Sequence, residues 1–236
     1  GEADPVVAHA LVEMAPALVE WLADRVGLPL ELATDFSYPG RSHHRCHTIP
    51  GRSGRIVMKH LVQVVREHPG IDLLDSASVQ HARPVAGGGF EISVQTPDGS
   101  ADMIESGALL LATNGFGASP ELVRRHIPEI SDAVYHGSPF SRGDALRIGA
   151  DNSAGVGYLD AYQGHAALAY GAGTLAGWAT VMHGGIIVND EGERFGDETM
   201  GYSEFAREVH KQPNSRAVLV LDQRIHLQLE RITPAR

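Results

Sequence analysis

The segment LLLATNGFGASPELVRR, residues 109–125, constrains the fold more than any other part of the sequence. A continuously apolar run is typical of a parallel strand buried on both faces, so residues 109–111 are predicted to form one. The run ends in small and polar residues, and Pro120 then begins a stretch with helical spacing. The glycines at 115 and 117 either supply a turn or let a ligand approach the carboxyl edge of a sheet, and the pattern alone favours neither.

Predicted helices and strands follow one another in an order typical of an α/β fold. The helices are expected within residues 5–21, 55–68, 120–126 and 143–155, and the strands within residues 71–85, 89–113, 184–190 and 217–222. Asp4 is the expected N-cap of the first helix, with Pro5 in its first turn. From about residue 159 the chain becomes glycine-rich, so we place a domain boundary between residues 1–158 and 159–236.

Composition limits the classes of function. The formal net charge of -10 argues against non-specific binding of nucleic acid, which needs a basic surface. No uninterrupted apolar run approaches the roughly 18 residues of a membrane span, and the acidic residues 1–4 do not look like a signal peptide. The single cysteine, Cys46, suits a reducing compartment, so we expect a cytoplasmic protein without a membrane span. The first residue is not Met, which indicates a processed chain or the interior of a longer one.

Two further motifs suggest ligands but have structural explanations. Residues 171–176, GAGTLA, approach a dinucleotide fingerprint, but the preceding HAALAY is a poor strand, so we predict a loop. His43, His44, Cys46 and His47 can all ligate zinc. Their tight spacing rarely lets four side chains converge on one tetrahedral centre, so we expect a loop and no metal site.

Several segments, in one collinear order, resemble the fumarate reductase/succinate dehydrogenase flavoprotein superfamily, and specifically its soluble, ketosteroid-dehydrogenase-like branch. They are HTIPGRSGRIVMKHLVQVV (47–65), LLLATNGFGASPELVRRHIPEI (109–130), SRGDALRIGADNSAG (141–155), YLDAYQGHAALA (158–169) and GGIIVNDEGERFGDETMGYSEF (184–205). The family's N-terminal G-x-G-x-x-G unit and its C-terminal segment are missing. The resemblance therefore implies the middle of a larger FAD enzyme, with part of a Rossmann-like FAD-binding domain (α/β) and the start of a substrate-capping domain (α+β).

The resemblance also implies site residues. Those expected near FAD are Gly51, Gly54, Ala112, Thr113, Asn114, Gly115, Gly117, Gly143 and Asp144. His165 and Gln163 match the family's substrate-binding Gln-x-His, although Ala166 replaces its proline. Tyr202 stands where fumarate reductases have a proton-delivering arginine, and is similar to the tyrosine that takes the proton in ketosteroid dehydrogenases. Arg194 and Glu198 are expected to pair with each other or to brace this turn.

The implied reaction is α,β-dehydrogenation of a carbonyl compound, or reduction of an activated alkene, with hydride passing to or from flavin N5. Tyr202 would transfer the proton. A phenol has a reference pKa near 10, so ionising one at pH 7 costs roughly 4 kcal/mol unless a cation or a hydrogen-bond donor stabilises the phenolate.

Two alternatives stay open. One is a fumarate-type reductase acting on a carboxylate, which needs fixed cations elsewhere in the pocket. The other is an inert flavin-fold domain that serves as a binding module. In each enzymatic case the partners are a small-molecule substrate, an electron donor or acceptor of unknown identity, and the remainder of the parent flavoprotein. Because the pyrophosphate loop is missing, we expect the isolated chain to be colourless.

Overall fold

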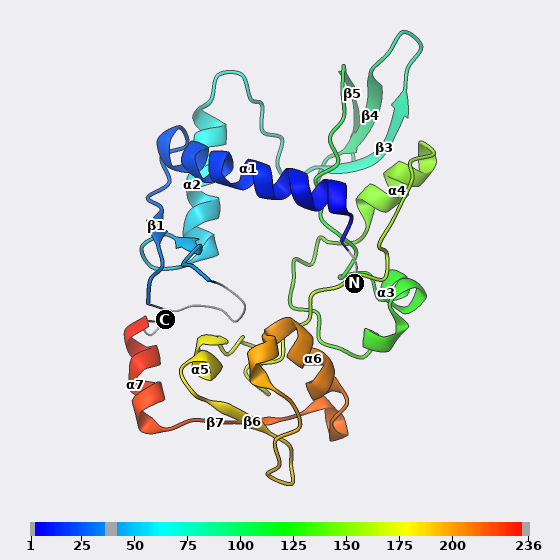
Figure 1. Ribbon diagram of the computed structural model, residues 1–236. Helices are drawn as coiled ribbons and strands as arrows, with labels where there is room; N and C mark the ends of the chain where they lie inside the picture. Colours follow the sequence, from blue (N-terminus) through cyan, green and yellow to red (C-terminus); the bar gives the residue numbers. More distant parts are fainter. Residues whose placement is uncertain (1–2, 36–41, 233–236) are drawn as a thin grey trace. The chain divides into compact units, whose positions relative to one another are not determined.

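The computed structural model describes residues 3–35 and 42–232, with side chains up to residue 227 (Figure 1). The chain forms two compact units. The first consists of Gly1–Ile71 and Gln163–Arg236, and the second of Asp72–Tyr162. Both contain helices and antiparallel strands, so the predicted mixture of helix and sheet is confirmed.

The N-terminal part of the first unit contains two helices, α1 (Pro5–Asp24) and α2 (Gly54–Glu67), and a small ribbon of β1 (Glu31–Leu32) and β2 (His47–Thr48). Helix α1 begins as predicted, because the Asp4 carboxylate accepts hydrogen bonds from the backbone N–H groups of Val6 and Val7. A hydrogen bond of 2.7 Å between the His60 imidazole and the Val26 carbonyl ties α2 to the end of α1.

Helix α1 is apolar, and none of its residues is buried. By length and composition alone it is long enough to cross a membrane, although Glu13 and Glu20 interrupt its apolar run. One such helix near the N-terminus is weak evidence for a membrane span, because the core helices of soluble proteins and signal sequences can have the same length and composition. The helical spacing of the apolar residues correctly predicted the helix, but it did not predict that Leu11 and Leu18 would be more than half exposed.

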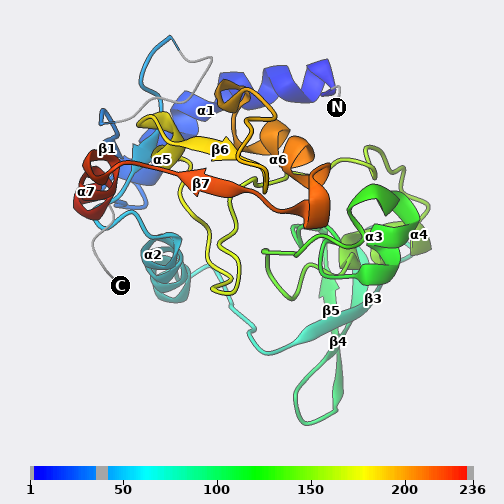
Figure 2. The same cartoon turned by 90° about the horizontal axis from the view of Figure 1, so that it is seen from below.

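The C-terminal part of the first unit packs around a β-ribbon. Strands β6 (Ile186–Val188) and β7 (Val218–Val220) pair antiparallel and lie side by side in Figure 2. The other elements are α5 (Ala179–Met182), the 3-10 turns Glu198–Met200 and Pro213–Ser215, α6 (Tyr202–His210) and α7 (Gln223–Ile232). Trp178, Val181, Ile187 and Phe205 form the buried cluster of this part, and Tyr202 packs against it.

The second unit is built on an antiparallel sheet in the order β3 (Ser78–Pro84), β4 (Phe90–Gln95) and β5 (Ala101–Ser106). As the alternation in β4 predicts, Ile92 and Val94 face a core that they share with Ala82 and Ile148. Ile148 belongs to α4 (Asp144–Asp151), which starts at the predicted place. The remaining elements are α3 (Pro120–His126), also as predicted, and a 3-10 turn at Pro128–Ile130.

The parallel strand predicted at residues 109–111 is wrong. This segment belongs to no sheet among the described residues, and Leu110 is 87% exposed. Leu109 and Leu111 pack against the core of the second unit, whereas Leu110 between them is on the outside. A parallel strand needs hydrogen-bonded neighbours, and the strands described in this unit pair antiparallel with one another.

Residues 171–176 form a loop, as predicted, closed by a bridge between Leu168 and Leu175. The predicted boundary between residues 158 and 159 concerns functional domains, which the division into two compact units does not test. It stays a prediction.

Candidate functional site

Tyr202 is the first residue of α6, and the preceding turn sets its position. The Asp197 carboxylate accepts hydrogen bonds from the backbone N–H and the hydroxyl of Thr199. Gly201 then adopts φ 88° and ψ 163°, a conformation essentially limited to glycine. One turn further along α6, Phe205 is fully buried and anchors the helix. The phenol of Tyr202 is therefore presented from a helix start that is fixed on both sides.

Residues 163–167 contact Tyr202 through both side chains and backbone. The Gln163 amide Nε2 donates to the Tyr202 hydroxyl oxygen at 3.1 Å, and the His165 ring stacks on the phenol with centroids 4.9 Å apart. The backbone N–H of Ala166 donates to the Tyr202 carbonyl at 3.1 Å. The structure thus brings together Tyr202, His165 and Gln163, which the family resemblance had singled out.

A backbone hydrogen bond orients His165. The N–H of Ala167 donates to Nδ1 of the imidazole at 3.2 Å, so Nδ1 acts as an acceptor. In a neutral imidazole the other nitrogen then carries the proton. Nε2 is therefore the donor side of this imidazole, whose ring stacks on Tyr202.

Trp178 is a member of the site that the sequence did not reveal. Its ring meets Tyr202 edge-on, with centroids 6.4 Å apart, and it is 3% exposed. Its indole N–H finds no hydrogen-bond partner within the described residues. A large aromatic residue in an otherwise glycine-rich stretch is the one signal that would have pointed to it.

Arg194 and Glu198 brace the turn before Tyr202, as expected. The Glu198 side chain is 7% exposed and accepts hydrogen bonds from the Ile187 backbone N–H at 2.9 Å and from the Arg194 guanidinium. Burial raises the pKa of the Glu198 carboxyl, but the hydrogen bonds from Arg194 and Ile187 outweigh burial, so this pKa lies below its usual range. The pair ties β6 to the turn that carries Tyr202.

The predicted cofactor residues between 112 and 144 meet in the second unit. The Ala145 backbone N–H donates to the Thr113 hydroxyl at 3.1 Å, and the Gly143 N–H donates to the Gly115 carbonyl at 3.2 Å. These bonds hold the segment Ala112, Thr113, Asn114, Gly115 and Gly117 against Gly143 and Asp144 at the start of α4.

This cluster fits a polar ligand. Residues 112–115 are exposed, and a side chain added at Gly115 would meet nothing within 4 Å. Ser141 is 2% exposed, yet its hydroxyl has no hydrogen-bond partner within the described residues. An unsatisfied buried hydroxyl beside open backbone is expected where a ligand completes the hydrogen bonding.

Gly51 and Gly54 belong to the first unit, where Gly51 lies in the loop that leads into α2 and Gly54 is the first residue of that helix. Gly51 has φ 81°, and the next residue, Arg52, forms an ion pair of 2.7 Å with Asp35. The hydrogen bond from Arg52 lowers the pKa of Asp35. This loop and the β1–β2 ribbon line a hollow of about 420 Å³.

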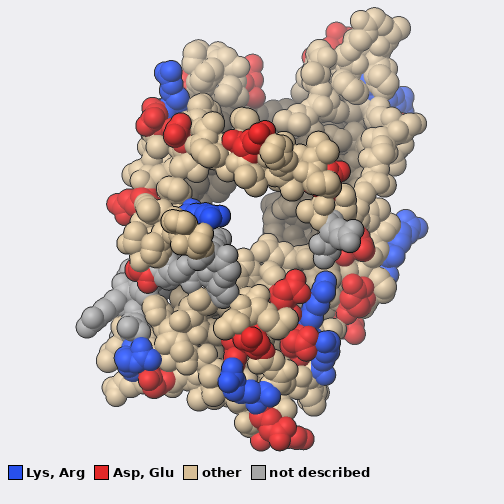
Figure 3. Space-filling view, in the orientation of Figure 1, with Lys and Arg blue, Asp and Glu red and all other residues tan. Residues whose placement is uncertain are grey.

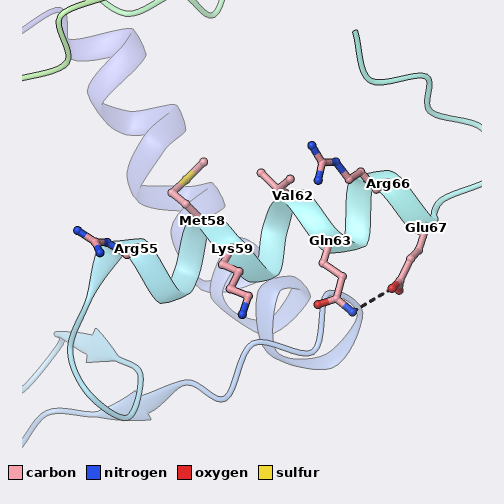
Figure 4. A pocket seen from close by; sticks show the side chains of 7 residues that line it. All are labelled: Arg55, Met58, Lys59, Val62, Gln63, Arg66 and Glu67. Carbon is pink, nitrogen blue, oxygen red and sulfur yellow. Dashed lines mark hydrogen bonds between the residues drawn. The ribbon is translucent and has the colours of Figure 1, made fainter. Parts of the chain in front are cut away.

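A second open hollow, of about 530 Å³, runs along one face of α2 (Figure 4). It is lined by Arg55, Met58, Lys59, Val62, Gln63, Arg66 and Glu67. All of these come from one helix and none is a predicted site residue, so we assign no function to this hollow. The part of the chain that the structure describes contains no group of three or more potential metal ligands. On the face shown in Figure 3, acidic and basic side chains are interspersed.

Comparison with known proteins bears on both clusters. A family model described as FAD binding domain matches residues 1–232. A fumarate reductase (cytochrome) from Shewanella frigidimarina is 24% identical over 233 residues, which is 97% of this chain and 40% of that protein. An NADH:fumarate oxidoreductase from Klebsiella pneumoniae is 27% identical over 228 residues, 94% of this chain and 24% of that protein. The chain thus spans two fifths or less of these curated relatives.

Two solved structures share the fold. The open conformation of a flavocytochrome c3 fumarate reductase matches with a TM-score of 0.74 and 22% identity, over 93% of this chain and 39% of that one. The 3-ketosteroid-Δ4-(5α)-dehydrogenase from Rhodococcus jostii RHA1, in complex with 4-androstene-3,17-dione, matches with a TM-score of 0.66 and 16% identity. That match covers 92% of this chain and 49% of the dehydrogenase.

Proposed function

The chain belongs to the FAD binding domain family, and we propose that its Tyr202 transfers the proton when the parent flavoprotein desaturates a carbonyl compound. The resemblance to the fumarate reductase and ketosteroid dehydrogenase flavoproteins is confirmed, as are the FAD-binding fold and FAD as the cofactor. The coarse function is therefore that of an FAD-dependent oxidoreductase. Substrate and mechanism are argued from the residues around Tyr202.

The proposed reaction breaks two C–H bonds, at the carbons α and β to a carbonyl, and forms one C=C bond. Bound FAD supplies the two-electron acceptor that takes one hydrogen as hydride. Tyr202, ionised beforehand, accepts the other hydrogen as a proton at its phenolate oxygen and becomes the neutral phenol, and the Nε2–H of His165 donates to the carbonyl oxygen. The reverse reaction, reduction of an activated alkene, uses the same residues with the proton moving from Tyr202. Thr113, Asn114, Gly115, Gly143 and Ser141 would hold part of the FAD.

One observation carries this proposal: the Tyr202 hydroxyl receives a hydrogen bond from Gln163 beside the stacked ring of His165. The Gln163 N–H can bond the oxygen of the neutral phenol and of the phenolate, so it can hold this oxygen in place throughout proton transfer. Gln163, His165 and Trp178 surround Tyr202 with an amide, an imidazole and an indole. A dicarboxylate site instead requires fixed cations, so this environment favours a neutral carbonyl substrate.

A fumarate-type reductase acting on a carboxylate is the second candidate. Its support is that the curated relatives described above carry the name fumarate reductase or fumarate oxidoreductase. In either case we propose that the chain works as one portion of a larger cytoplasmic flavoprotein, with a small-molecule substrate and a separate electron donor or acceptor. An inert flavin-fold domain that only binds partners is the remaining alternative.

The test is turnover by the full-length flavoprotein with either 4-androstene-3,17-dione and an artificial electron acceptor, or fumarate and a reduced dye. We expect activity with the ketosteroid and a loss in kcat of about 10²- to 10⁴-fold in Tyr202→Phe, the usual size of an acid–base contribution. Tyr170→Phe is the matched control, since Tyr170 is 80% exposed and lies under Arg216. Full turnover by Tyr202→Phe would remove the proposed role. Turnover of fumarate with inhibition by small dicarboxylates would support the second candidate.

A further inference from the structure

We propose that Gln163 is a positioning residue, which holds the phenol oxygen of Tyr202 in the orientation needed for proton transfer. The inference rests on the proposed function, because it concerns the same tyrosine. The family resemblance marks Gln163 as a substrate contact, and that role stays a prediction. The geometry adds a different one, since the Gln163 amide donates to Tyr202 at 3.1 Å.

The N–H of Gln163 occupies one acceptor position of the phenol oxygen, and it can do so in the neutral phenol and in the phenolate alike. A proton from the substrate must therefore be taken by another lone pair of this oxygen. The bond to Gln163 also limits the movement of the oxygen. Without this bond the oxygen has more positions available, and only a fraction of them face a substrate carbon. Orienting a catalytic group before the reaction lowers the barrier, because the entropy of ordering has already been lost.

The amide and the phenol are held on one local scaffold. The Ala166 backbone donates to the Tyr202 carbonyl, and the His165 ring stacks on the phenol, so two residues that closely follow Gln163 are held against Tyr202. Trp178 meets the phenol edge-on. His165 and Trp178 therefore contact the ring, whereas Gln163 contacts the phenol oxygen itself.

Gln163 can be replaced without opening the core, because it is exposed, whereas Trp178 and Phe205 are buried. Gln163→Leu removes the donor at similar size, and Gln163→Glu replaces the amide by a group that only accepts. Gln63→Leu is the matched control. Gln63 is also an exposed glutamine in a side-chain hydrogen bond, here to Glu67 of the same helix.

The first measurement is ultraviolet resonance Raman spectroscopy of the full-length protein. The difference spectrum against Tyr202→Phe isolates Tyr202, and the intensity ratio of the tyrosine doublet distinguishes a phenol oxygen that accepts hydrogen bonds from one that donates. We expect an acceptor signature in the parent protein and in Gln63→Leu, and its loss in Gln163→Leu and Gln163→Glu. A parent spectrum in which the phenol only donates, or one that Gln163→Leu leaves unchanged, overturns the proposal.

The second measurement is steady-state kinetics with the ketosteroid. We expect Gln163→Leu to lower kcat about tenfold with little change in KM, as for a group that acts on the transition state only. A higher KM with unchanged kcat would instead make Gln163 a substrate contact and overturn the positioning role. The two hypotheses fail separately. If Tyr202→Phe keeps full turnover, the proposed function fails, whereas an impaired Tyr202→Phe beside a normal Gln163→Leu refutes only the positioning role.

Discussion

Replacing Arg194 by methionine tests the brace that holds the turn before Tyr202. The Glu198 carboxylate is 7% exposed, and the change leaves it with the Ile187 N–H as its remaining donor among those described above. Removing one partner of a buried ion pair costs about 3–5 kcal/mol. Because Arg194 itself is 55% exposed, water can reach part of the vacated space, so we expect a loss near the lower end, about 2–3 kcal/mol at pH 7.

The pH dependence of this loss makes the test specific. In the parent protein the folded-state pKa of Glu198 is lowered, so its contribution to stability is present above the unfolded pKa of about 4.3 and disappears as the pH falls through the folded value. In Arg194→Met, burial is less opposed and raises the pKa of Glu198. In this variant, protonation of Glu198 at low pH removes the destabilising buried charge. The free energy of unfolding then rises with acidification by at most about 1.4 kcal/mol per pH unit. The difference between the two proteins should therefore begin to shrink as the pH falls through the raised pKa of Glu198 in Arg194→Met, above about 4.3, and stop shrinking below the lowered pKa of the parent protein.

Urea unfolding followed by fluorescence provides the measurement, since Trp178 lies in the core beside Tyr202. Arg207→Met is the control: its ion pair with Glu204 spans 3.9 Å between exposed side chains and should change stability by less than about 0.5 kcal/mol. Equal effects of the two substitutions, or a loss in Arg194→Met that does not depend on pH, would refute the argument.

Three further predictions concern other parts of the chain. Gly201→Ala should destabilise the protein by about 1–3 kcal/mol in urea unfolding, through the backbone alone, because the new Cβ would meet nothing within 4 Å; an unchanged stability would contradict the conformation of this turn. Phe205→Ala should cost about 3–5 kcal/mol, whereas Phe140→Ala, at a side chain that is 78% exposed, should cost far less, and similar losses would contradict the assigned core. An NMR titration should give Asp98 a pKa of about 2, because the Thr96 hydroxyl and the Ser100 N–H and hydroxyl donate to it; a value near 4 would show that this turn is open.

Local elements were predictable because their determinants are close in sequence. Asp4 caps α1, and Ser119 accepts from the Leu122 N–H at the start of α3. The alternation around Ile92 places the right face of β4 inside. The strand expected at residues 109–111 failed for the opposite reason: its formation depends on neighbouring strands, which an apolar run does not specify.

The site was only partly predictable from residue patterns. Helical spacing and glycine content do not show that Gln163 and His165 lie against Tyr202, which follows nearly forty positions later. Only the family resemblance brought these residues together before the structure did. Trp178 was missed because a single aromatic residue in a loop has no periodicity to reveal which partner it packs against.

The brace also bears on the choice between a neutral and a carboxylate substrate. Arg194 lies four residues before Glu198, in the same segment as Tyr202. A carboxylate substrate would be expected to form an ion pair with Arg194. If Arg194 paired with the substrate, the Glu198 carboxylate would stay buried with the Ile187 N–H as its remaining donor among those described above. Arg194→Met produces the same state. The same 2–3 kcal/mol would then be subtracted from substrate binding, about a 30- to 150-fold loss of affinity. On the proposed function, a dicarboxylate would need cations from elsewhere in the parent flavoprotein, whereas a ketone would need one donor, the role assigned above to the Nε2–H of His165.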